Sequence, residues 1–237
     1  IVEHGGGPAR KTRALVDAVA SELGSCRYVP FDVSEEMLRR SSRMLLADYP
    51  WLTVHGIVGD YDLHLDRLPA GDRHLFLFLG GTIGNFEHGA DTKFLAHVAS
   101  QMGPDDRLLL GTDLVKDTAT LDAAYNDAQG ITAEFNKNVI AVVNRELGGH
   151  FDLPSFEHLA FYDPEKERIE MHLRARRAHD VEIDALGMCV HFERGETILT
   201  EISRKFSRPS VERMLDRSGL ETCRWYAADA DAFGLTL

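Results

Sequence analysis

The sequence predicts an α/β protein: a parallel, doubly wound sheet with an inserted antiparallel α+β lobe. Two observations predict this fold class. Over residues 1–117, apolar strand-like runs alternate with helical patterns four times, and such alternation is typical of a parallel sheet that binds ligands at the carboxyl ends of its strands. From about residue 118, a long helical stretch is followed by short alternating strands, which indicates an antiparallel lobe. We therefore expect a core of residues 1–117 and 208–237, interrupted by a lobe of residues 118–207.

The elements of the core follow from local patterns. The expected strands are residues 1–4, 26–32, 52–58, 74–79 and 107–113, and the expected helices between them are residues 11–23, 37–49 and 91–101. The fourth run is apolar throughout, as a strand buried on both faces requires. Ser34 stands where a helix N-cap is expected, and Gly24 where a helix ends.

The second half reads differently. Residues 121–147 have a helical pattern with a possible break at Gly130, and strand-like runs follow at residues 159–163, 168–175, 189–193 and 196–206. Turn signals such as Asp163-Pro164 separate them. A short helix over residues 210–218 and a strand pair at residues 221–227 and 232–237 are expected to return to the main sheet.

Composition narrows the class of function. The 237 residues include 26 Lys and Arg against 38 Asp and Glu, a net charge of −12. This acidity disfavours nucleic-acid and membrane-surface partners, because both are polyanions. No run approaches the roughly 20 apolar residues of a membrane span, and no signal peptide is visible. Three widely spaced cysteines suit a reducing compartment, so we expect a cytoplasmic, monomeric enzyme acting on a small molecule.

The start of the chain bears on completeness. Residue 1 is not methionine, and only four residues precede the glycine loop. A glycine loop normally follows a whole strand, so native sequence is expected upstream; a short natural first strand is the alternative.

A glycine loop and a downstream acid indicate a nucleoside ligand. Gly5-Gly6-Gly7 follows the first strand, although Arg10 occupies the last position of the G-x-G-x-x-G pattern. Glycines let a ligand approach the backbone at the positive end of the next helix. Asp32 ends the second strand, where an acid can bind a ribose diol. Enzymes using NAD and enzymes using S-adenosylmethionine (SAM) share this geometry, and the missing third glycine favours SAM.

Two further loops lie at expected carboxyl ends of strands. Asp60-Tyr61 follows the third strand, where an acid and an aromatic ring suit adenine, although a solvated acid beside a packing tyrosine is an equally good interpretation. Residues 80–86 follow the fourth strand and contain Gly80, Thr82 and Asn85, which suggests close approach of a substrate. The eleven histidines form no H-E-x-x-H, and no G-x-S-x-G or P-loop is present, so neither metal, hydrolase nor kinase chemistry is expected.

Longer motifs resemble one family. They are Gly5-x-Gly7-x-x-x-Lys11-Thr12-Arg13, Tyr28-Val29-Pro30-x-Asp32-Val33-Ser34, Gly59-Asp60-Tyr61, Phe78-Leu79-Gly80-Gly81-Thr82-Ile83-Gly84-Asn85-Phe86, Gly111-Thr112-Asp113-Leu114-Val115-Lys116-Asp117, Ala124-Tyr125-Asn126-Asp127, Thr132-Ala133-Glu134-Phe135-Asn136-Lys137-Asn138 and Thr200-Glu201-Ile202-Ser203-Arg204-Lys205-Phe206. Together they resemble the histidine-specific, SAM-dependent N-alpha-methyltransferases of ergothioneine biosynthesis, over nearly the whole chain. The resemblance implies a Rossmann-like SAM-methyltransferase sheet with a substrate-binding lobe.

The resemblance also implies roles for particular residues. The cofactor-binding residues would be Gly5, Gly7, Lys11, Asp32, Asp60 and Tyr61. The residues contacting the histidine substrate would be Gly80, Thr82, Asn85, Tyr125, Met171, Glu201 and Ser203. Glu201 and Ser203 would bind the imidazole, although by spacing alone a solvated Glu/Ser face is the more common interpretation. No catalytic acid or base is assigned, and no metal is implied.

Departures from the family keep alternatives open. Pro8, Ala9 and Arg10 replace polar positions of the loop, His4 replaces an apolar residue, and Tyr61 stands where phenylalanine is usual. The family also has a helical segment before the first strand that closes over the substrate. The alternatives are a truncated or non-catalytic module that binds SAM or histidine without turnover, and an NAD-dependent oxidoreductase.

Overall fold

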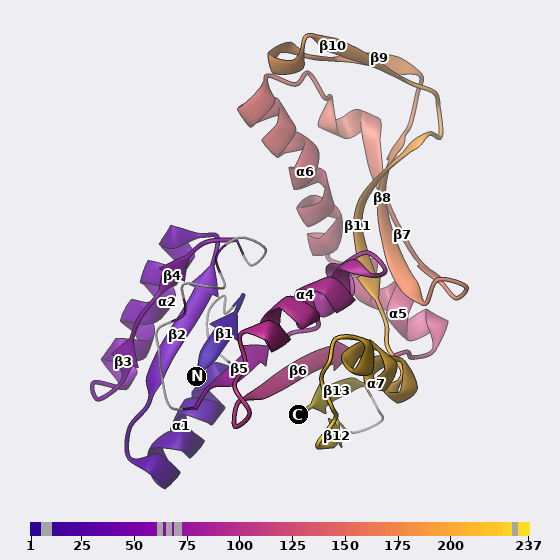
Figure 1. Cartoon of the computed structure of the whole chain (residues 1–237). Helices are drawn as coiled ribbons and strands as arrows, with labels where there is room; N and C mark the ends of the chain where they lie inside the picture. The colour runs from indigo at the N-terminus through magenta and orange to yellow at the C-terminus, as the bar shows by residue number, and fades with distance from the viewer. Residues whose placement is uncertain (6–10, 61–63, 65–67, 69–72, 229–231) are drawn as a thin grey trace. The chain divides into compact units, whose positions relative to one another are not determined.

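The structure is a computed structural model that describes residues 1–5, 11–60, 64, 68, 73–228 and 232–237 (Figure 1). The chain divides into two compact units. Unit 1 comprises Ile1–Leu114 and Phe206–Leu237, and unit 2 comprises Val115–Lys205. The expected boundaries, 117 and 208, differ from the observed 114 and 206 by three and two residues.

The sheet of unit 1 holds strands from both ends of the chain (Figure 1). Its strands are β1 (Val2–His4), β2 (Arg27–Asp32), β3 (Thr53–Val54), β4 (Ile57–Val58), β5 (Leu75–Phe78), β6 (Arg107–Asp113), β12 (Trp225–Ala227) and β13 (Phe233–Thr236). They are ordered β12-β13-β6-β5-β1-β2-β3, with β4 also paired to β2. The pairs from β6 to β3 are parallel, whereas β13 is antiparallel to both β6 and β12. The expected α/β class and the returning strand pair are confirmed.

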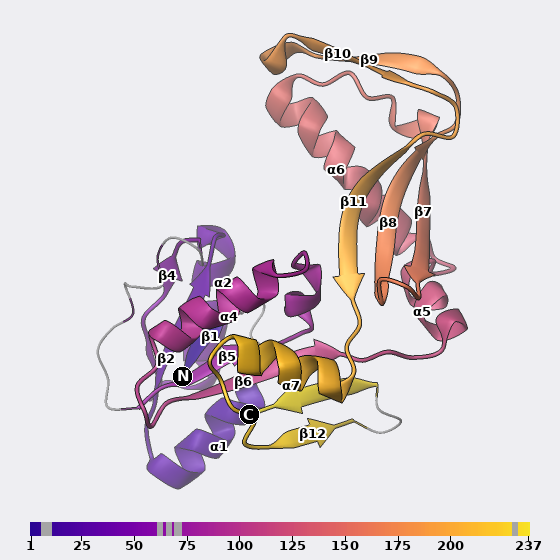
Figure 2. The ribbon, with the colours of Figure 1, turned by 45° about the vertical axis from the view of Figure 1, so that its right-hand side comes forward.

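Helices cover both faces of this sheet (Figure 2). They are α1 (Thr12–Leu23), α2 (Glu35–Asp48), α4 (Ala90–Ser100) and α7 (Arg208–Arg217). Side chains of α4 and α7 pack with Phe31 of β2 in one buried cluster, whereas those of α1 and α2 pack in another with Tyr28, three residues earlier on β2. Residues an odd number of positions apart on a strand point to opposite faces, so the sheet is doubly wound. Both predicted caps are confirmed: the Ser34 hydroxyl accepts from the Met37 N–H, and Gly24 ends α1 with φ of 74°.

The third expected strand, residues 52–58, is interrupted. It forms β3 and β4, both parallel to β2 in a constant register. That register places Gly56 beside Pro30 of β2, and a Cβ on Gly56 would lie 4.0 Å from the Pro30 ring. Proline has no N–H to donate across the ladder, so the pairing fails there and resumes at Ile57.

Unit 2 is an antiparallel sheet with two helices, as expected for the inserted lobe. It contains α5 (Thr118–Tyr125), α6 (Ile131–Leu147), β7 (Phe156–Asp163), β8 (Arg168–Ala175), β9 (His179–Ile183), β10 (Met188–Phe192) and β11 (Thr197–Arg204). Three strands are ordered β11-β8-β7, and β9 pairs with β10 in a separate hairpin. The predicted break at Gly130 is confirmed, because Gly130 caps α6 with φ of 72°. Strand β9 was not expected.

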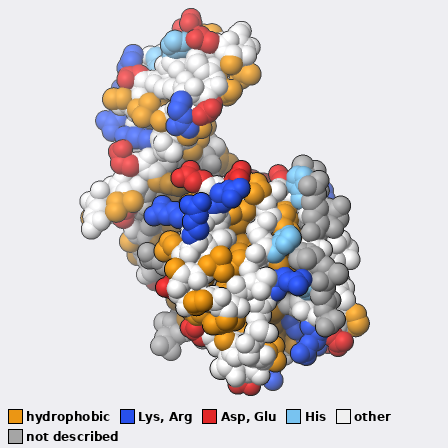
Figure 3. Space-filling view, turned by 90° about the vertical axis from the view of Figure 1, so that its left-hand side faces the viewer, with side chains coloured by type: hydrophobic (Ala, Val, Ile, Leu, Met, Phe, Trp, Pro, Cys, Tyr) orange, Lys and Arg blue, Asp and Glu red, His pale blue; other side chains and the backbone are white. Residues whose placement is uncertain are grey.

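One face of the three-stranded sheet is covered by the helices. Ile169 and Met171 of β8 pack with Leu121 of α5, and Leu173 packs with Ile140 of α6. These odd-numbered residues of β8 share one face, because side chains alternate along a strand. Figure 3 shows one side of the molecular surface, on which acidic, basic and apolar side chains are mixed. None of the described helices is long and apolar enough to cross a bilayer.

Candidate functional site

The carboxyl edge of the unit 1 sheet gathers residues expected to bind the cofactor, Gly5 and Asp32, and one expected to contact the substrate, Gly80. Gly5 follows β1, Asp32 ends β2, and Gly80 lies two residues after β5. These three strands are parallel neighbours, so their carboxyl ends lie at the same edge. Gly5 has φ of 67°, and its N–H donates to the Phe31 carbonyl at 2.9 Å. One Asp32 carboxylate oxygen accepts from the Ser34 N–H at 3.0 Å, which connects β2 to the start of α2.

Lys11 lies close to Gly80. A Cβ placed on Gly80 would come within 2.9 Å of the Lys11 Nζ atom. Gly80 also has φ of 83°, a conformation that glycine adopts without strain. The Thr82 hydroxyl donates to the Leu79 carbonyl at 3.2 Å, inside a short 3-10 helix, η2 (Thr82–Asn85). Asn85 ends η2 as an exposed side chain. The loop expected over residues 80–86 is therefore partly helical. The Lys11 ammonium lies beside Gly80, where the loop begins and has no side chain.

The loop after β4 contains a histidine that the sequence did not single out. The Asp60 N–H donates to His64 Nδ1 at 3.1 Å, and the His64 N–H donates back to the Asp60 carbonyl at 3.1 Å. A Cβ on Gly59 would lie 3.1 Å from this imidazole. Gly7, Tyr61 and the changed positions Pro8, Ala9 and Arg10 all lie outside the described residues.

A buried acid also escaped the sequence interpretation. Glu3 of β1 is only 4 % exposed, and its carboxylate accepts from the hydroxyls of Thr12 and Tyr28. Burial raises its pKa, and the two hydroxyl donors and the Lys11 charge partly offset the rise. Through these hydrogen bonds the Glu3 carboxylate connects β1, which precedes the glycine loop, to α1, which follows it, and to the neighbouring strand β2. The available signal was an acid within an apolar strand immediately before that loop.

In unit 2, four residues expected to bind substrate share one face. Glu201 and Ser203 of β11 lie directly across from Met171 and Ile169 of β8, in unbroken register. Their side chains therefore point the same way, towards the face that α5 covers. Tyr125, at the end of α5, packs against the cluster that contains Met171, and its hydroxyl donates to Ser203 Oγ at 2.9 Å.

The electrostatics of this face are mixed. Burial raises the pKa of Glu201, and the nearby charge of Lys205 partly offsets the rise. Lys205 is 2 % exposed and donates to both the Ser203 and the Tyr125 hydroxyls, at 2.8 and 3.0 Å. Met171 is equally buried and offers an apolar surface. The face can thus present a carboxylate, hydroxyls and an apolar wall to one ligand.

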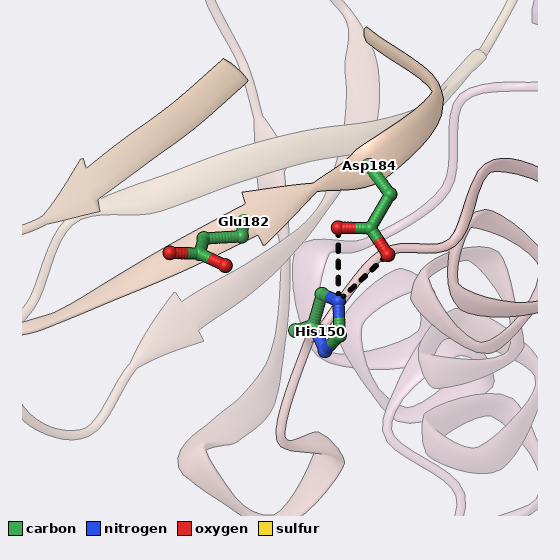
Figure 4. Close-up of side chains that lie close together, drawn as sticks. All are labelled: His150, Glu182 and Asp184. Atoms are coloured by element: carbon green, nitrogen blue, oxygen red, sulfur yellow. Dashed lines mark hydrogen bonds and ion pairs between the residues drawn. The ribbon is translucent and has the colours of Figure 1, made fainter. Parts of the chain in front are cut away.

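Elsewhere in unit 2, a histidine and two acids more than 30 residues downstream of it form a trio of metal-ligand types. His150, Glu182 and Asp184 place one ligand atom each within 4.8 Å of one another, and Figure 4 shows the His150 imidazole hydrogen-bonded to Asp184, with Glu182 to one side. His150 Nε2 lies 3.1 Å from an Asp184 oxygen. All three residues are exposed, and an exposed His–Asp pair accounts for their arrangement. We do not count the trio as part of the candidate site.

A hollow in unit 1 lies away from the carboxyl edge. It measures about 620 Å³ and is lined by Ile1, Arg27, His74 and Arg107, among others. These residues begin or precede β1, β2, β5 and β6. The hollow therefore opens at the amino ends of the parallel strands, opposite the expected ligand edge.

Comparisons with known proteins agree with this geometry. Residues 1–237 match the family model described as histidine-specific methyltransferase, SAM-dependent. A histidine N-alpha-methyltransferase of Mycolicibacterium smegmatis is 46 % identical over all of this chain and 74 % of its own length. Ergothioneine biosynthesis protein 1 of Neurospora crassa is 30 % identical over 93 % of this chain and 25 % of its own.

A solved structure supports the fold alone. The S-adenosylmethionine-dependent methyltransferase from Clostridium acetobutylicum covers 99 % of this chain and 81 % of its own, with a TM-score of 0.52 at 11 % identity. The family match extends over both units, and neither an NAD-dependent oxidoreductase nor a non-catalytic module is favoured by it. The chain belongs to the histidine-specific, SAM-dependent methyltransferases.

Proposed function

We propose that this chain transfers methyl groups from SAM to the alpha-amino nitrogen of L-histidine, giving trimethylhistidine (hercynine) for ergothioneine biosynthesis. The observation that carries the proposal is the unit 2 face on which Glu201, Ser203, Met171 and Tyr125 lie together. The names of the relatives from M. smegmatis and N. crassa support the substrate and the pathway.

The carboxyl edge of unit 1 suits SAM. Gly5 and Gly80 have positive φ, and the Lys11 ammonium already occupies the space a Gly80 side chain would need. Gly5, Gly7 and Lys11 would bind the methionine part of SAM, and the Asp32 carboxylate would accept from the ribose hydroxyls. Asp60 and Tyr61 would lie at the adenine. When bound, SAM supplies an activated methyl group on a sulfonium.

The substrate residues fit a small, polar amino acid. Asn85 and Tyr125 would bind the carboxylate and amino end of histidine, and Gly80 and Thr82 would shape the floor between substrate and methyl donor. A carboxylate such as Glu201 can accept an imidazole N–H, and Ser203 can serve the other nitrogen. Met171, which is 2 % exposed, would pack against the ring.

The proposed reaction mainly requires that the alpha-amine be aligned with the methyl group of SAM. The neutral alpha-amine attacks the methyl carbon, the carbon–sulfur bond breaks, and the nitrogen loses a proton before each of the next transfers. Holding the amine in line with the methyl group can lower the barrier by roughly 7–11 kcal/mol at the favourable limit. The residues assigned to substrate bind and orient, and no side chain is assigned the role of base.

Further properties follow from the same proposal. The three cysteines, Cys26, Cys189 and Cys223, are free, which suits the reducing cytoplasm. We propose that the protein works there as a monomer, on SAM and histidine, with no metal, nucleic acid or membrane partner.

The test is mass spectrometry of histidine after incubation with the protein and SAM, with SAM binding followed by calorimetry. Stepwise mono-, di- and trimethylhistidine are expected. SAM binding without methylated histidine would instead support the non-catalytic module. An unchanged histidine together with no SAM binding would refute the proposal outright.

A further inference from the structure

Lys205 is a buried cation that connects two of the proposed substrate contacts. It follows β11 by one residue and is 2 % exposed. Its Nζ atom lies 2.8 Å from Ser203 Oγ, 3.0 Å from the Tyr125 hydroxyl and 4.9 Å from the Tyr125 ring centroid. Lysines are almost never fully buried unless they are paired, so its position calls for an explanation.

The hydrogen bonds that Ser203 already makes leave its hydroxyl able to donate one further hydrogen bond. An ammonium only donates, whereas a serine hydroxyl has two lone pairs and one hydrogen. Lys205 donates to Ser203 Oγ, and the Tyr125 hydroxyl donates to the same oxygen at 2.9 Å. Both lone pairs of Ser203 are then engaged. Among the residues that the structure describes, no acceptor takes the Ser203 hydrogen, so Ser203 can act towards a ligand only as a donor.

Glu201 offers the opposite character on the same face. It lies two residues before Ser203 on β11, with no irregularity between them, and residues so spaced point to one side about 6.6 Å apart. An ionised carboxylate only accepts. The pair thus presents one acceptor and one donor, with Met171 directly across from Glu201 on β8.

A neutral imidazole has the complementary pattern. One of its ring nitrogens carries a hydrogen and the other accepts. The doubly protonated ring has two N–H groups, so one would face the Ser203 hydrogen, near the positive charge of Lys205. The other titratable groups at this face include Tyr125 of α5, Tyr162 of β7, which packs with Ile169 and Met171, and His158 of β7, whose Nε2 lies 2.9 Å from the Tyr125 carbonyl.

We propose that Lys205 is a positioning residue for substrate specificity: it holds Ser203 as a hydrogen-bond donor, so that Ser203 and Glu201 together select a neutral ring with one N–H and one bare nitrogen. This inference rests on the proposed function, and it adds a residue and a protonation state to it. Lys205 acts through Ser203 and Tyr125 and need not touch the substrate.

The test compares histidine with 3-(pyrrol-2-yl)alanine and 3-(pyrrol-3-yl)alanine, in each of which one ring nitrogen is replaced by C–H. The wild type should use both analogues at least about tenfold less well than histidine by kcat/KM, because Ser203 loses its acceptor. In Lys205→Met the Ser203 hydroxyl can turn, so the preference for histidine over the analogue that keeps its N–H towards Glu201 should narrow to about threefold or less, mainly through a higher KM for histidine. The other analogue also loses the hydrogen bond to Glu201 and should stay disfavoured. Ser203→Ala should narrow the first preference in the same way while leaving Lys205 in place, and it serves if Lys205→Met fails to fold.

A matched control is Lys166→Met, an exposed lysine of unit 2 that pairs with Asp163 and Glu170; it should keep the full preference. If Lys205→Met and Ser203→Ala lower kcat/KM for histidine and both analogues by the same factor, the inference is overturned although the proposed function stands. A wild type that does not methylate histidine overturns both.

Discussion

The Lys11 ammonium nitrogen lies where a side chain on Gly80 would have to go, 2.9 Å from the ideal Cβ position. Lys11 directly precedes α1, and Gly80 follows β5, so this contact joins the start of a helix to the carboxyl end of a strand. Because Gly80 and Lys11 are both assigned to the proposed ligand edge, their contact is a place where a small change should alter binding.

Gly80→Ala should weaken SAM binding about tenfold or more. Its methyl group would displace Lys11, and the φ of 83° would add strain of roughly 1–2 kcal/mol. Gly89→Ala is the matched control, because Gly89 has φ of 91° and nothing within 4 Å of its Cβ position. Both variants should lose similar stability in denaturant unfolding, but calorimetry should find weaker SAM binding only in Gly80→Ala. Equal SAM affinity in the two variants would refute the proposed role of this contact.

Glu201→Ala should weaken the binding of histidine and leave the binding of SAM unchanged. Loss of a hydrogen bond to a charged group costs about 1.5–3 kcal/mol, so KM for histidine should rise roughly 10- to 100-fold. SAM affinity measured by calorimetry should not change. Glu165→Ala, at an exposed position before β8, is the control and should behave as wild type. An equal loss of histidine and SAM binding in Glu201→Ala would contradict the assigned role.

Local patterns predicted most of the fold. Residues 107–113 and 168–175 match β6 and β8 from end to end, because the pattern of apolar and polar side chains within each run is enough to indicate a strand. The interruption between β3 and β4 could not be predicted in this way, since it depends on Pro30 of a neighbouring strand. Strand β9 was missed for a similar reason: it is short and carries exposed polar residues, and its pairing with β10 completes it.

In the candidate site, too, local geometry could be predicted from the sequence, whereas contacts between distant elements could not. That Glu201 and Ser203 face one way follows from the period of a strand. The bonds of Lys205 to Tyr125, 80 residues away, and of Asn136 to the His172 carbonyl, 36 residues away, depend on how separate elements pack. Neither composition nor spacing reports such contacts. The same holds for His150 and Asp184, which are 34 residues apart.

The His150 trio allows the expected absence of a metal to be tested. Methyl transfer needs no metal in the proposed mechanism, so dialysis against EDTA should leave the rate of histidine methylation unchanged. His150→Ala, which removes one ligand type from the exposed trio, should also have the wild-type rate. A loss of activity on chelation that added zinc or manganese reverses, and that His150→Ala reproduces, would show that the trio holds a required ion.

His4 should make stability depend on pH. Its imidazole is 1 % exposed and lies among the rings of Phe31, Phe76, Phe78 and Phe94, with centroids 5.9–6.5 Å away. Burial lowers its pKa from 6.5 to about 4. Between these values the unfolded chain binds a proton that the folded chain does not. Stability from the neutral ring is therefore complete above pH 6.5 and is lost as the pH falls towards 4.

The comparison with His4→Leu isolates this contribution, because Leu is apolar and does not titrate, while other groups such as Glu3 titrate in both proteins. Urea unfolding at pH 7 and pH 4.5 should show the wild type losing about 2 kcal/mol more than His4→Leu between the two conditions. If both proteins lose the same free energy of unfolding, the folded state accommodates a protonated His4, and the ring cannot be held neutral by the four phenylalanines. Because the difference between two proteins is measured at each pH, a general acid sensitivity of the fold cancels from the result.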